Sequence, residues 1–168
     1  MEKLKLRNPH ILDKGYRNFE GRARNNIPAG VRTFGIEFDE YEAEELTQMG
    51  WRLKPKYKAK PEDPDMFVLY VAVRFDKFPP SIITFTEDPV KGMVMRTLTE
   101  ETVKILDYSI IDKSAVVISG SKMGKPYLEK LIVKIKTDEV DDFFADEYRM
   151  AYGEGEHVST DEEVPFDI

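Results

Sequence analysis

Residues 66–75 constrain the fold of this chain more than any other segment, because they form its strongest β-strand pattern. β-Branched and aromatic side chains dominate the run, and such side chains favour a pleated strand. Alternate side chains of a strand point to opposite faces. One face is entirely apolar and consists of Phe67, Leu69, Val71, Val73 and Phe75. We therefore expect this face to lie in a core, with Tyr70 and Arg74 on the other side.

Further short strands are predicted before and after this run, separated by turns rich in Gly and Pro. They cover residues 16–22, 31–38, 51–58, 81–86, 108–119 and 127–136. Residues 89–97, in contrast, are predicted to form a loop. Many short strands with few helices are typical of a small barrel or sandwich. We predict a mainly β protein built on a five-stranded OB-fold barrel, with an inserted hairpin and short helices.

Three segments carry helix signals. Asp39 and Glu42 form a capping-box pattern before a short apolar stripe that ends at Gly50. A second helix is predicted to begin at Thr99, where the chain leaves the strand-rich middle region. The third segment, residues 138–148, is acidic and carries apolar side chains at intervals of four: Val140, Phe144 and Tyr148.

The distribution of charge divides the chain. Of its 168 residues, 25 are Lys or Arg and 32 are Asp or Glu, which gives a net charge of −7. From Thr137 onward there are twelve carboxylates and one arginine, so this end carries −11 and the remainder +4. We predict a flexible N-terminal arm (residues 1–14), an OB-fold nucleic-acid-binding domain (15–136), and an acidic C-terminal helix and disordered tail (137–168).

The residue types argue against most catalytic and metal chemistry. The chain has no cysteine, which excludes disulfides and thiolate sites, and its only histidines are His10 and His157. The turn at residues 120–126 has the glycines of a phosphate loop, but Pro126 stands where a Ser or Thr would hold magnesium. We expect no enzyme activity, no catalytic residues, no metal and no cofactor.

Cations and aromatic rings cluster in the first half of the chain. Single-stranded nucleic acid binding needs this mixture, because cations follow the phosphates and rings stack on unpaired bases. The predicted phosphate contacts are Arg17, Arg22, Arg24, Arg32, Arg52, Lys54, Lys56 and Arg74. The predicted stacking residues are Trp51, Tyr57, Tyr70 and Phe78. A solvated cationic face with its aromatic side chains in the core is the alternative interpretation.

The acidic end carries a second predicted binding element. Its last residues set an aromatic side chain and a proline among carboxylates, which is a pattern suited to a basic pocket on another protein. The predicted partner-binding residues are Asp161, Glu162, Glu163, Val164, Pro165 and Phe166. Such a tail could also occupy the cationic groove when nucleic acid is absent. A role in solubility alone is the other interpretation.

Two stretches resemble known families. The end Asp161-Glu162-Glu163-Val164-Pro165-Phe166 resembles the acidic Pro-Phe tip of bacterial single-stranded DNA-binding proteins, which recruits repair and replication partners, although Asp167 and Ile168 follow the phenylalanine here. The body, through residues 16–22, 26–34 and 127–130, is similar to bacteriophage OB-fold single-stranded DNA-binding proteins. This resemblance implies DNA binding through the OB face and no catalysis.

From these observations we expect a sequence-nonspecific single-stranded DNA-binding protein. It would protect or present DNA in phage replication, recombination or repair and recruit replication or recombination proteins through its acidic tail. We expect it in the cytoplasm of the host cell, without a membrane partner. Assembly into a homo-oligomer stays open. Two alternatives stay open: a protein-interaction adaptor that uses its acidic aromatic tail, and an OB protein that binds single-stranded RNA.

Overall fold

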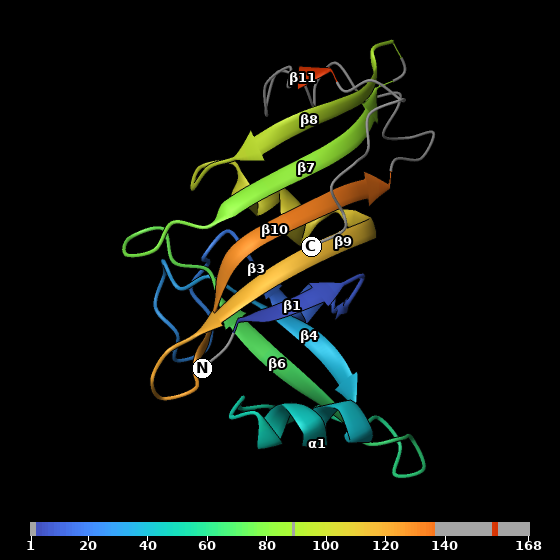
Figure 1. Cartoon of the computed structure of the whole chain (residues 1–168), viewed down its shortest axis with the longest axis vertical. Helices are drawn as coiled ribbons and strands as arrows, with labels where there is room; N and C mark the ends of the chain where they lie inside the picture. The colour runs from blue at the N-terminus through green and yellow to red at the C-terminus, as the bar shows by residue number, and fades with distance from the viewer. Residues whose placement is uncertain (1–2, 89, 137–155, 158–168) are drawn as a thin grey trace.

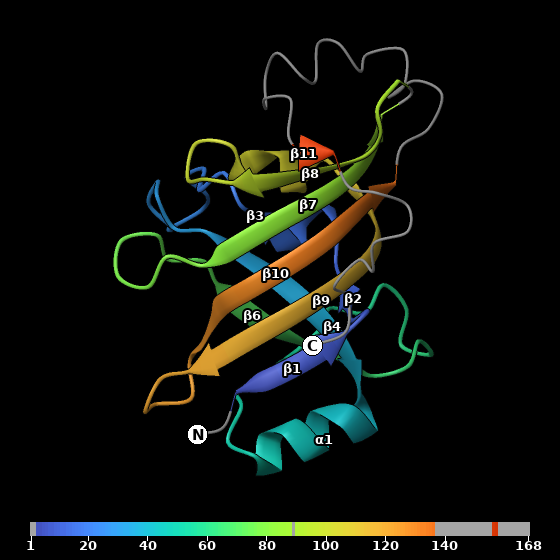
Figure 2. The ribbon, with the colours of Figure 1, turned by 45° about the horizontal axis from the view of Figure 1, so that its top comes forward.

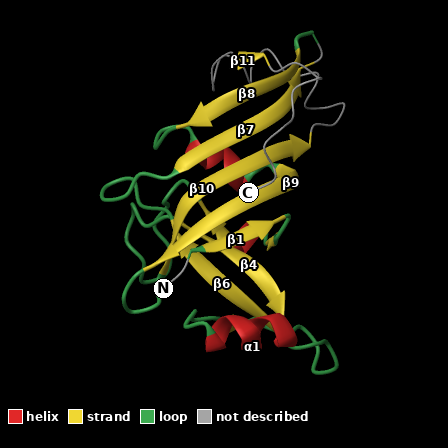
Figure 3. Cartoon of the chain, viewed as in Figure 1, coloured by secondary structure: helices red, strands yellow, loops and turns green. Residues whose placement is uncertain are grey.

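The computed structural model describes residues 3–88, 90–136 and 156–157, and this part of the chain is mainly β. Its strands are β1 (Leu4–Arg7), β2 (His10–Ile11), β3 (Arg17–Asn18), β4 (Thr33–Asp39), β5 (Lys54–Pro55), β6 (Met66–Ala72), β7 (Ser81–Asp88), β8 (Gly92–Leu98), β9 (Ile110–Gly120), β10 (Pro126–Lys136) and β11 (Glu156–His157). The described helices are α1 (Glu40–Gln48) and two short 3₁₀ helices, η1 (Lys14–Tyr16) and η2 (Val103–Asp107). Figure 3 shows the predominance of strands.

The strands form one mixed sheet in the order β11-β8-β7-β10-β6-β4-β2. β10 is parallel to β6 and β7 and antiparallel to β9. β1 pairs with β9, β3 with β4, and β5 with β6. In Figure 1, β8, β7, β10, β9 and β1 follow one another down the molecule, and β4 and β6 cross behind them toward α1. The sheet therefore bends into two layers that meet at β10.

The described strands do not close into a barrel, which corrects the predicted barrel. β1 joins β9 and β2 joins β4, but Asn8 and Pro9 interrupt the chain between these two short strands. Asn8 has a φ of 50° and is fixed there by two hydrogen bonds with Ser114, its N–H donating to the carbonyl and its Oδ1 accepting from the N–H. Residues 4–7 and 10–11, which lie in the predicted flexible arm (residues 1–14), thus belong to the sheet.

The core lies between the two layers. The predicted inner face of β6 is confirmed for Leu69 and Val71, which are buried beside Phe34 and Ile36 of β4. From the opposite layer β9 and β10 contribute the apolar side chains Val116, Ile118, Leu128, Leu131 and Val133. η2 adds buried side chains from the connection between β8 and β9. Tyr70 lies on the outer face, as the alternation of β6 predicted.

Helix α1 begins and ends where the sequence predicted. The side chain of Asp39 accepts from the N–H of Glu42, and the carboxylate of Glu42 accepts from the N–H of Asp39, which completes the capping box. Gly50 follows the helix with a φ of 100°, a conformation that glycine adopts without strain. The helix lies at the far end of β4 and β6 (Figure 1).

Two segments differ from the sequence-based prediction. Residues 92–97, which fall in the predicted loop at 89–97, belong to β8, because Gly92 with its φ of 78° turns the chain back. Val94 and Leu98 are then buried. Of residues 51–58, predicted as a strand, only Lys54 and Pro55 form a strand, and the N–H of Lys56 adds one hydrogen bond to the carbonyl of Met66. The predicted helix at residues 138–148 lies outside the described residues.

Replacing Asp39 with alanine removes the acceptor that satisfies the first turn of α1. We expect Asp39→Ala to lower the free energy of unfolding by about 1 kcal/mol, measured by urea denaturation. Asp39→Asn keeps an acceptor at the same place and serves as the control. Equal stability of the alanine and asparagine variants would contradict the capping role.

Candidate nucleic-acid interface

The outer face of β4, β5 and β6 is the candidate interface. The register pairs Gly35 with Tyr70 and Glu37 with Val68, so these four residues share the face opposite the core. Lys54 of β5 pairs with Val68 from the other side and joins them. Three neighbouring strands thus present a ring, a carboxylate and an amine to one surface.

Tyr16 and Tyr70 form a stacked pair on this face. Their ring centroids are 6.4 Å apart and their planes differ by 24°. Tyr16 lies directly over Gly35, because a Cβ built on that glycine would be 3.5 Å from the Cβ of Tyr16 and only 2.8 Å from Cγ1 of Val68. The absence of a side chain at residue 35 therefore allows η1 to bring the Tyr16 ring onto the sheet.

Two lysine amines lie over these rings. Nζ of Lys54 is 5.8 Å from the ring centroid of Tyr70, and Nζ of Lys56 is 5.9 Å from that of Tyr16. A cation at this distance is attracted by the electrons of the ring face. The arrangement holds positive charge beside aromatic surface, which is what a base and its adjoining phosphate require.

A second aromatic pair extends the face. Phe78, which is 60% exposed, stacks on Tyr127 with centroids 5.5 Å apart. Tyr127 of β10 is the parallel neighbour of Ala72, two residues after Tyr70 on β6. Tyr127 therefore lies on the same side of the sheet as Tyr70. We call these four side chains the aromatic row: Tyr16, Tyr70, Tyr127 and Phe78.

Arg52 lies where the turn between β9 and β10 packs against the segment that leads into β5. A Cβ built on Gly124 would be 2.7 Å from the carbonyl oxygen of Gly50 and 3.8 Å from Cγ of Arg52. Arg52 itself is exposed. The absence of a side chain at Gly124 therefore allows this close approach of the two segments.

Among the described residues, Glu37 is the acidic residue whose carboxylate is hydrogen bonded to a lysine of this face. Its Oε2 accepts from Nζ of Lys56 at 2.5 Å, and its Oε1 is 2.9 Å from Nδ1 of His10. Burial alone would raise the pKa of Glu37, but the hydrogen bond and charge of Lys56, with His10, outweigh it and hold this pKa below its usual value. The same hydrogen bond raises the pKa of Lys56. Lys56 is therefore charged but already partly neutralised.

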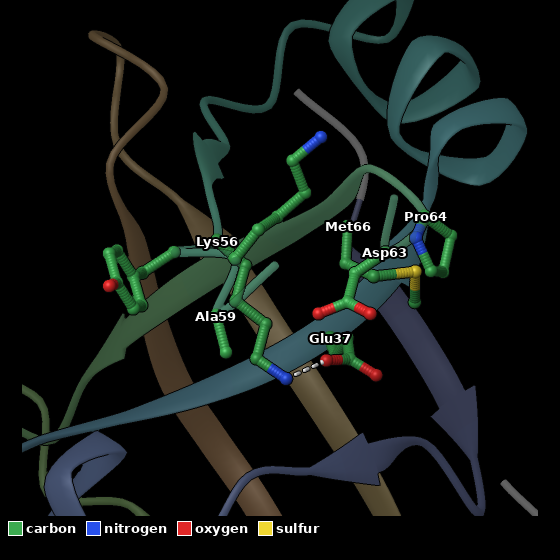
Figure 4. A pocket seen from close by; sticks show the side chains of 8 residues that line it. Glu37, Lys56, Ala59, Asp63, Pro64 and Met66 are labelled. Atoms are coloured by element: carbon green, nitrogen blue, oxygen red, sulfur yellow. Dashed lines mark hydrogen bonds and ion pairs between the residues drawn. The ribbon is translucent and has the colours of Figure 1, made fainter. Parts of the chain in front are cut away.

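A pocket of about 410 Å³ adjoins this ion pair (Figure 4). It lies between the chain after β5 and the start of β6, and Figure 4 shows the Lys56 amine pointing toward Glu37 with Asp63 and Pro64 opposite. A second ion pair, Lys58 with Asp65 at 2.6 Å, lies nearby in the chain. The lining residues are Glu37, Lys56, Tyr57, Lys58, Ala59, Asp63, Pro64 and Met66.

The structure places two predicted contact residues in the interior. Trp51 is 2% exposed and packs in the core, so its ring face is not open to a base. Arg17 is 6% exposed and donates to three carbonyls, those of Leu12 (2.8 Å), Leu106 (3.1 Å) and Ser109 (2.7 Å). Burial lowers the pKa of Arg17, although Asp13 and Asp107 act in the opposite direction. Arg17 joins segments of the chain and does not face solvent.

The other arginines of the first half divide between loop contacts and the surface. Arg24 donates to the carbonyls of Gly15 (2.8 Å) and Arg17 (2.7 Å). The guanidinium of Arg32 lies 5.6 Å from the ring centroid of Phe75 and 3.4 Å from Glu100. Arg22 and Arg74 are exposed and pair with neighbouring carboxylates, Glu20 and Asp76.

The conspicuous side chains of residues 17–34 mainly hold together the loop between β3 and β4. Oδ1 of Asn18 accepts from the N–H groups of Gly21 and Arg22, and the carboxylate of Asp107 accepts from those of Phe19 and Glu20. Phe19 stacks on Phe34 at 5.1 Å inside the core. The motif that resembles the phage proteins is thus largely a scaffold for Tyr16 and the neighbouring strand.

Two members of the aromatic row were missed by the sequence reasoning. Tyr127 could have been found from alternation, because it precedes Leu128, which is buried in the core. Tyr16 follows no periodic pattern, and only its position over Gly35 identifies it. Of the predicted stacking residues, Tyr70 and Phe78 lie in the row, and Tyr57 is 84% exposed at the pocket. The predicted tail residues Asp161, Glu162, Glu163, Val164, Pro165 and Phe166 lie outside the described part of the chain.

In residues 3–88, 90–136 and 156–157, no three His, Asp or Glu side chains come together as a metal would require. None of the helices in the same ranges is long and apolar enough to cross a membrane.

A family model described as "Putative phage ssDNA-binding domain" matches residues 1–152. Searches of curated proteins and of solved structures found no match.

The buried position of Arg17 generates a test of stability. Arg17→Met would leave the carbonyls of Leu12, Leu106 and Ser109 without this donor, and we expect a loss of roughly 3 kcal/mol in the free energy of unfolding. Urea denaturation followed by the fluorescence of the buried Trp51 measures the loss. Arg22→Met, on the surface, should change stability by less than about 0.5 kcal/mol. Similar losses in both variants would contradict the structural role of Arg17.

Proposed function

The chain belongs to the phage single-stranded-DNA-binding domain family, and from this premise we propose that it binds single-stranded DNA across the outer face of β4, β5 and β6 with little sequence preference. The family match covers 152 residues and supports single-stranded DNA as the ligand. It also supports a phage origin. The location on this face is our inference from the geometry.

The observation that carries the proposal is the stacked Tyr16–Tyr70 pair with the amines of Lys54 and Lys56 over its rings. Base stacking on an aromatic side chain contributes about 1–3 kcal/mol and tolerates any base, because every base has a π face. Lysine contacts to phosphate are equally independent of sequence. A face of this composition favours unpaired strands over duplexes, whose bases are already stacked.

We further propose that the strands follow an open form of the OB arrangement. That fold is a five-stranded, partly open barrel that binds oligonucleotides on the face of its second and third strands. If β1 and β2 count as one interrupted first strand, β4 and β6 take the second and third places, and β10 and β9 supply the rest. The aromatic row then lies where OB proteins bind their strands.

The biological role extends this proposal. We propose a non-enzymatic protein that protects or presents single-stranded DNA during phage replication, recombination or repair. Its acidic tip, residues 161–166, would recruit partner proteins. The resemblance of this tip to the bacterial one, together with the twelve carboxylates from Thr137 onward, supports that part.

Removal of the stacked rings should weaken DNA binding. We expect Tyr70→Ala and Tyr16→Ala each to reduce affinity for labelled oligo-dT about 5- to 150-fold, the equivalent of about 1–3 kcal/mol. Fluorescence anisotropy at two salt concentrations measures the affinity. Tyr41→Ala, which removes an exposed tyrosine from α1, is the matched control and should leave affinity unchanged.

Competitors complete this experiment. Duplex DNA of equal length should compete poorly, and single-stranded RNA of equal length shows which polymer the face prefers. Full affinity in the Tyr70→Ala and Tyr16→Ala variants, or efficient competition by duplex, would contradict the proposed interface.

Release of Lys56 from Glu37 should have the opposite effect. Glu37→Gln removes the negative charge that holds Lys56, and a phosphate can then take its place. We expect affinity for oligo-dT to rise several-fold and the slope of log K against log salt to become steeper by about 0.7, the value for one additional phosphate contact on a single strand.

The same change in a Lys56→Gln background isolates the cause. There Glu37→Gln should alter neither the affinity nor the salt slope. An equal gain in both backgrounds would show that Glu37 acts through the general charge of the surface and not through Lys56.

A further inference from the structure

A second apolar cluster lies on the face of β7, β9 and β10 that points away from the core. Phe85 (2% exposed), Ala115 and Ile132 form its buried centre. The register places Ile132 beside both Ala115 and Ile83. Met93 and Met95 of β8 pack against the cluster and are half-buried. The cluster is therefore continuous over four neighbouring strands.

Burial of this cluster requires a covering layer. The opposite faces of the same strands already fill the main core with Ile82, Val116 and Leu131. A phenylalanine on an uncovered sheet face keeps much of its surface in water. Among described residues, the apolar side chains packed on Phe85 come from the sheet itself. Something other than these strands covers it.

Cations surround the cluster. The pairing of Lys130 with Val117 and of Lys134 with Lys113 places these lysines on the same face as Ile132. Lys5 and Arg7 join them from β1, because they pair with Val117 and Ala115. A covering segment with apolar side chains and many carboxylates would complement this surface in both respects.

We propose that residues 137–152 of the same chain cover this face as part of the folded domain. This segment begins directly after Lys136, the end of β10, and the chain returns to the sheet at β11, where Glu156 pairs with Met95. Figure 2 shows β11 beside β8. β10 and β8 are two strand spacings apart, about 10 Å, which three or four extended residues would bridge. The nineteen residues between Lys136 and Glu156 are far more than that connection needs.

The composition of the segment fits the surface. Residues 137–155 contain seven carboxylates and one arginine, against five surrounding cations, of which Lys134 already lies near Glu87 (4.0 Å) and Asp112 (3.7 Å). Val140, Phe144 and Tyr148 would form one apolar stripe of the predicted helix over residues 138–148. Eleven helical residues span about 16 Å, close to the width from β9 to β8.

The family match gives independent support, because it extends to residue 152 and includes this segment. The domain would then end near residue 152, and the predicted boundary at residue 136 would divide a folded unit. This proposal does not depend on DNA binding.

Methionine oxidation in the full-length chain tests the cover without nucleic acid. Hydrogen peroxide oxidises exposed methionines faster, and peptide mass spectrometry reports the rate at each one. We expect Phe144→Ser/Tyr148→Ser to raise the rates at Met93 and Met95 at least threefold. Exposed Met49 and Met123 should keep their rates and serve as internal references. The matched variant Phe144→Leu/Tyr148→Phe keeps apolar side chains and should behave as wild type.

Unchanged rates at Met93 and Met95 in the serine variant would overturn the proposal. Protection in the wild-type chain that disappears on dilution would also overturn it, because a second copy would then be the cover. Unaltered fluorescence of buried Trp51 shows that the variant is folded.

A measurement on the unmodified sequence avoids dependence on the variants. A zero-length carbodiimide cross-linker joins lysines to carboxylates that are paired with them. We expect links from Lys113, Lys130 or Lys134 to carboxylates between residues 138 and 147. In a mixture of ¹⁴N- and ¹⁵N-labelled protein these links should lie within single chains. Links only between chains, or none to this segment, would contradict the proposal.

Discussion

Strand β10 divides its hydrogen bonds between two otherwise separate parts of the sheet, and the rest of the structure depends on this division. One edge pairs with β9 along nearly its whole length. The other edge first meets β6, where Tyr127 pairs with Ala72, and then β7, from Lys130 to Lys134. A register shift between Leu128 and Lys130 lies at the change of partner. A bulge of this kind bends a strand, so the two layers can meet there and enclose the core.

The candidate interface follows from the same division. The chain that connects β6 to β7 leaves the sheet where β10 changes partner, and it carries Phe78 back onto Tyr127. On the other side of β6, the pairing with β4 puts Gly35 opposite Tyr70 and makes room for Tyr16. The buried polar side chains of β3, Arg17 and Asn18, follow Tyr16 directly and fix its approach through hydrogen bonds with the backbone. The aromatic row is therefore held by backbone pairing and by a polar interior.

Local patterns predicted part of this arrangement. The two faces of β6 and the capping box of α1 depend on neighbours within a few residues, and both are confirmed. Arg17 and Trp51 have the residue types of a DNA surface, but their burial is decided by segments distant in the sequence, such as η2. The same applies to Tyr16, whose place depends on a glycine in another element. Strand β8 was missed because its own sequence pattern is weak and its strand conformation depends on pairing with β7.

The central place of β10 also determines the order in which the strands can pair during folding. The partners of β10 in β6 and β7 are made about fifty residues before it. During synthesis both strands therefore wait with an unpaired edge while β9 and the intervening helix are still being added. Contacts this distant in sequence slow folding, and exposed strand edges invite association with other chains. We therefore expect rapid emergence of β9 and β10 from the ribosome to shorten the time in which these edges can associate with other chains.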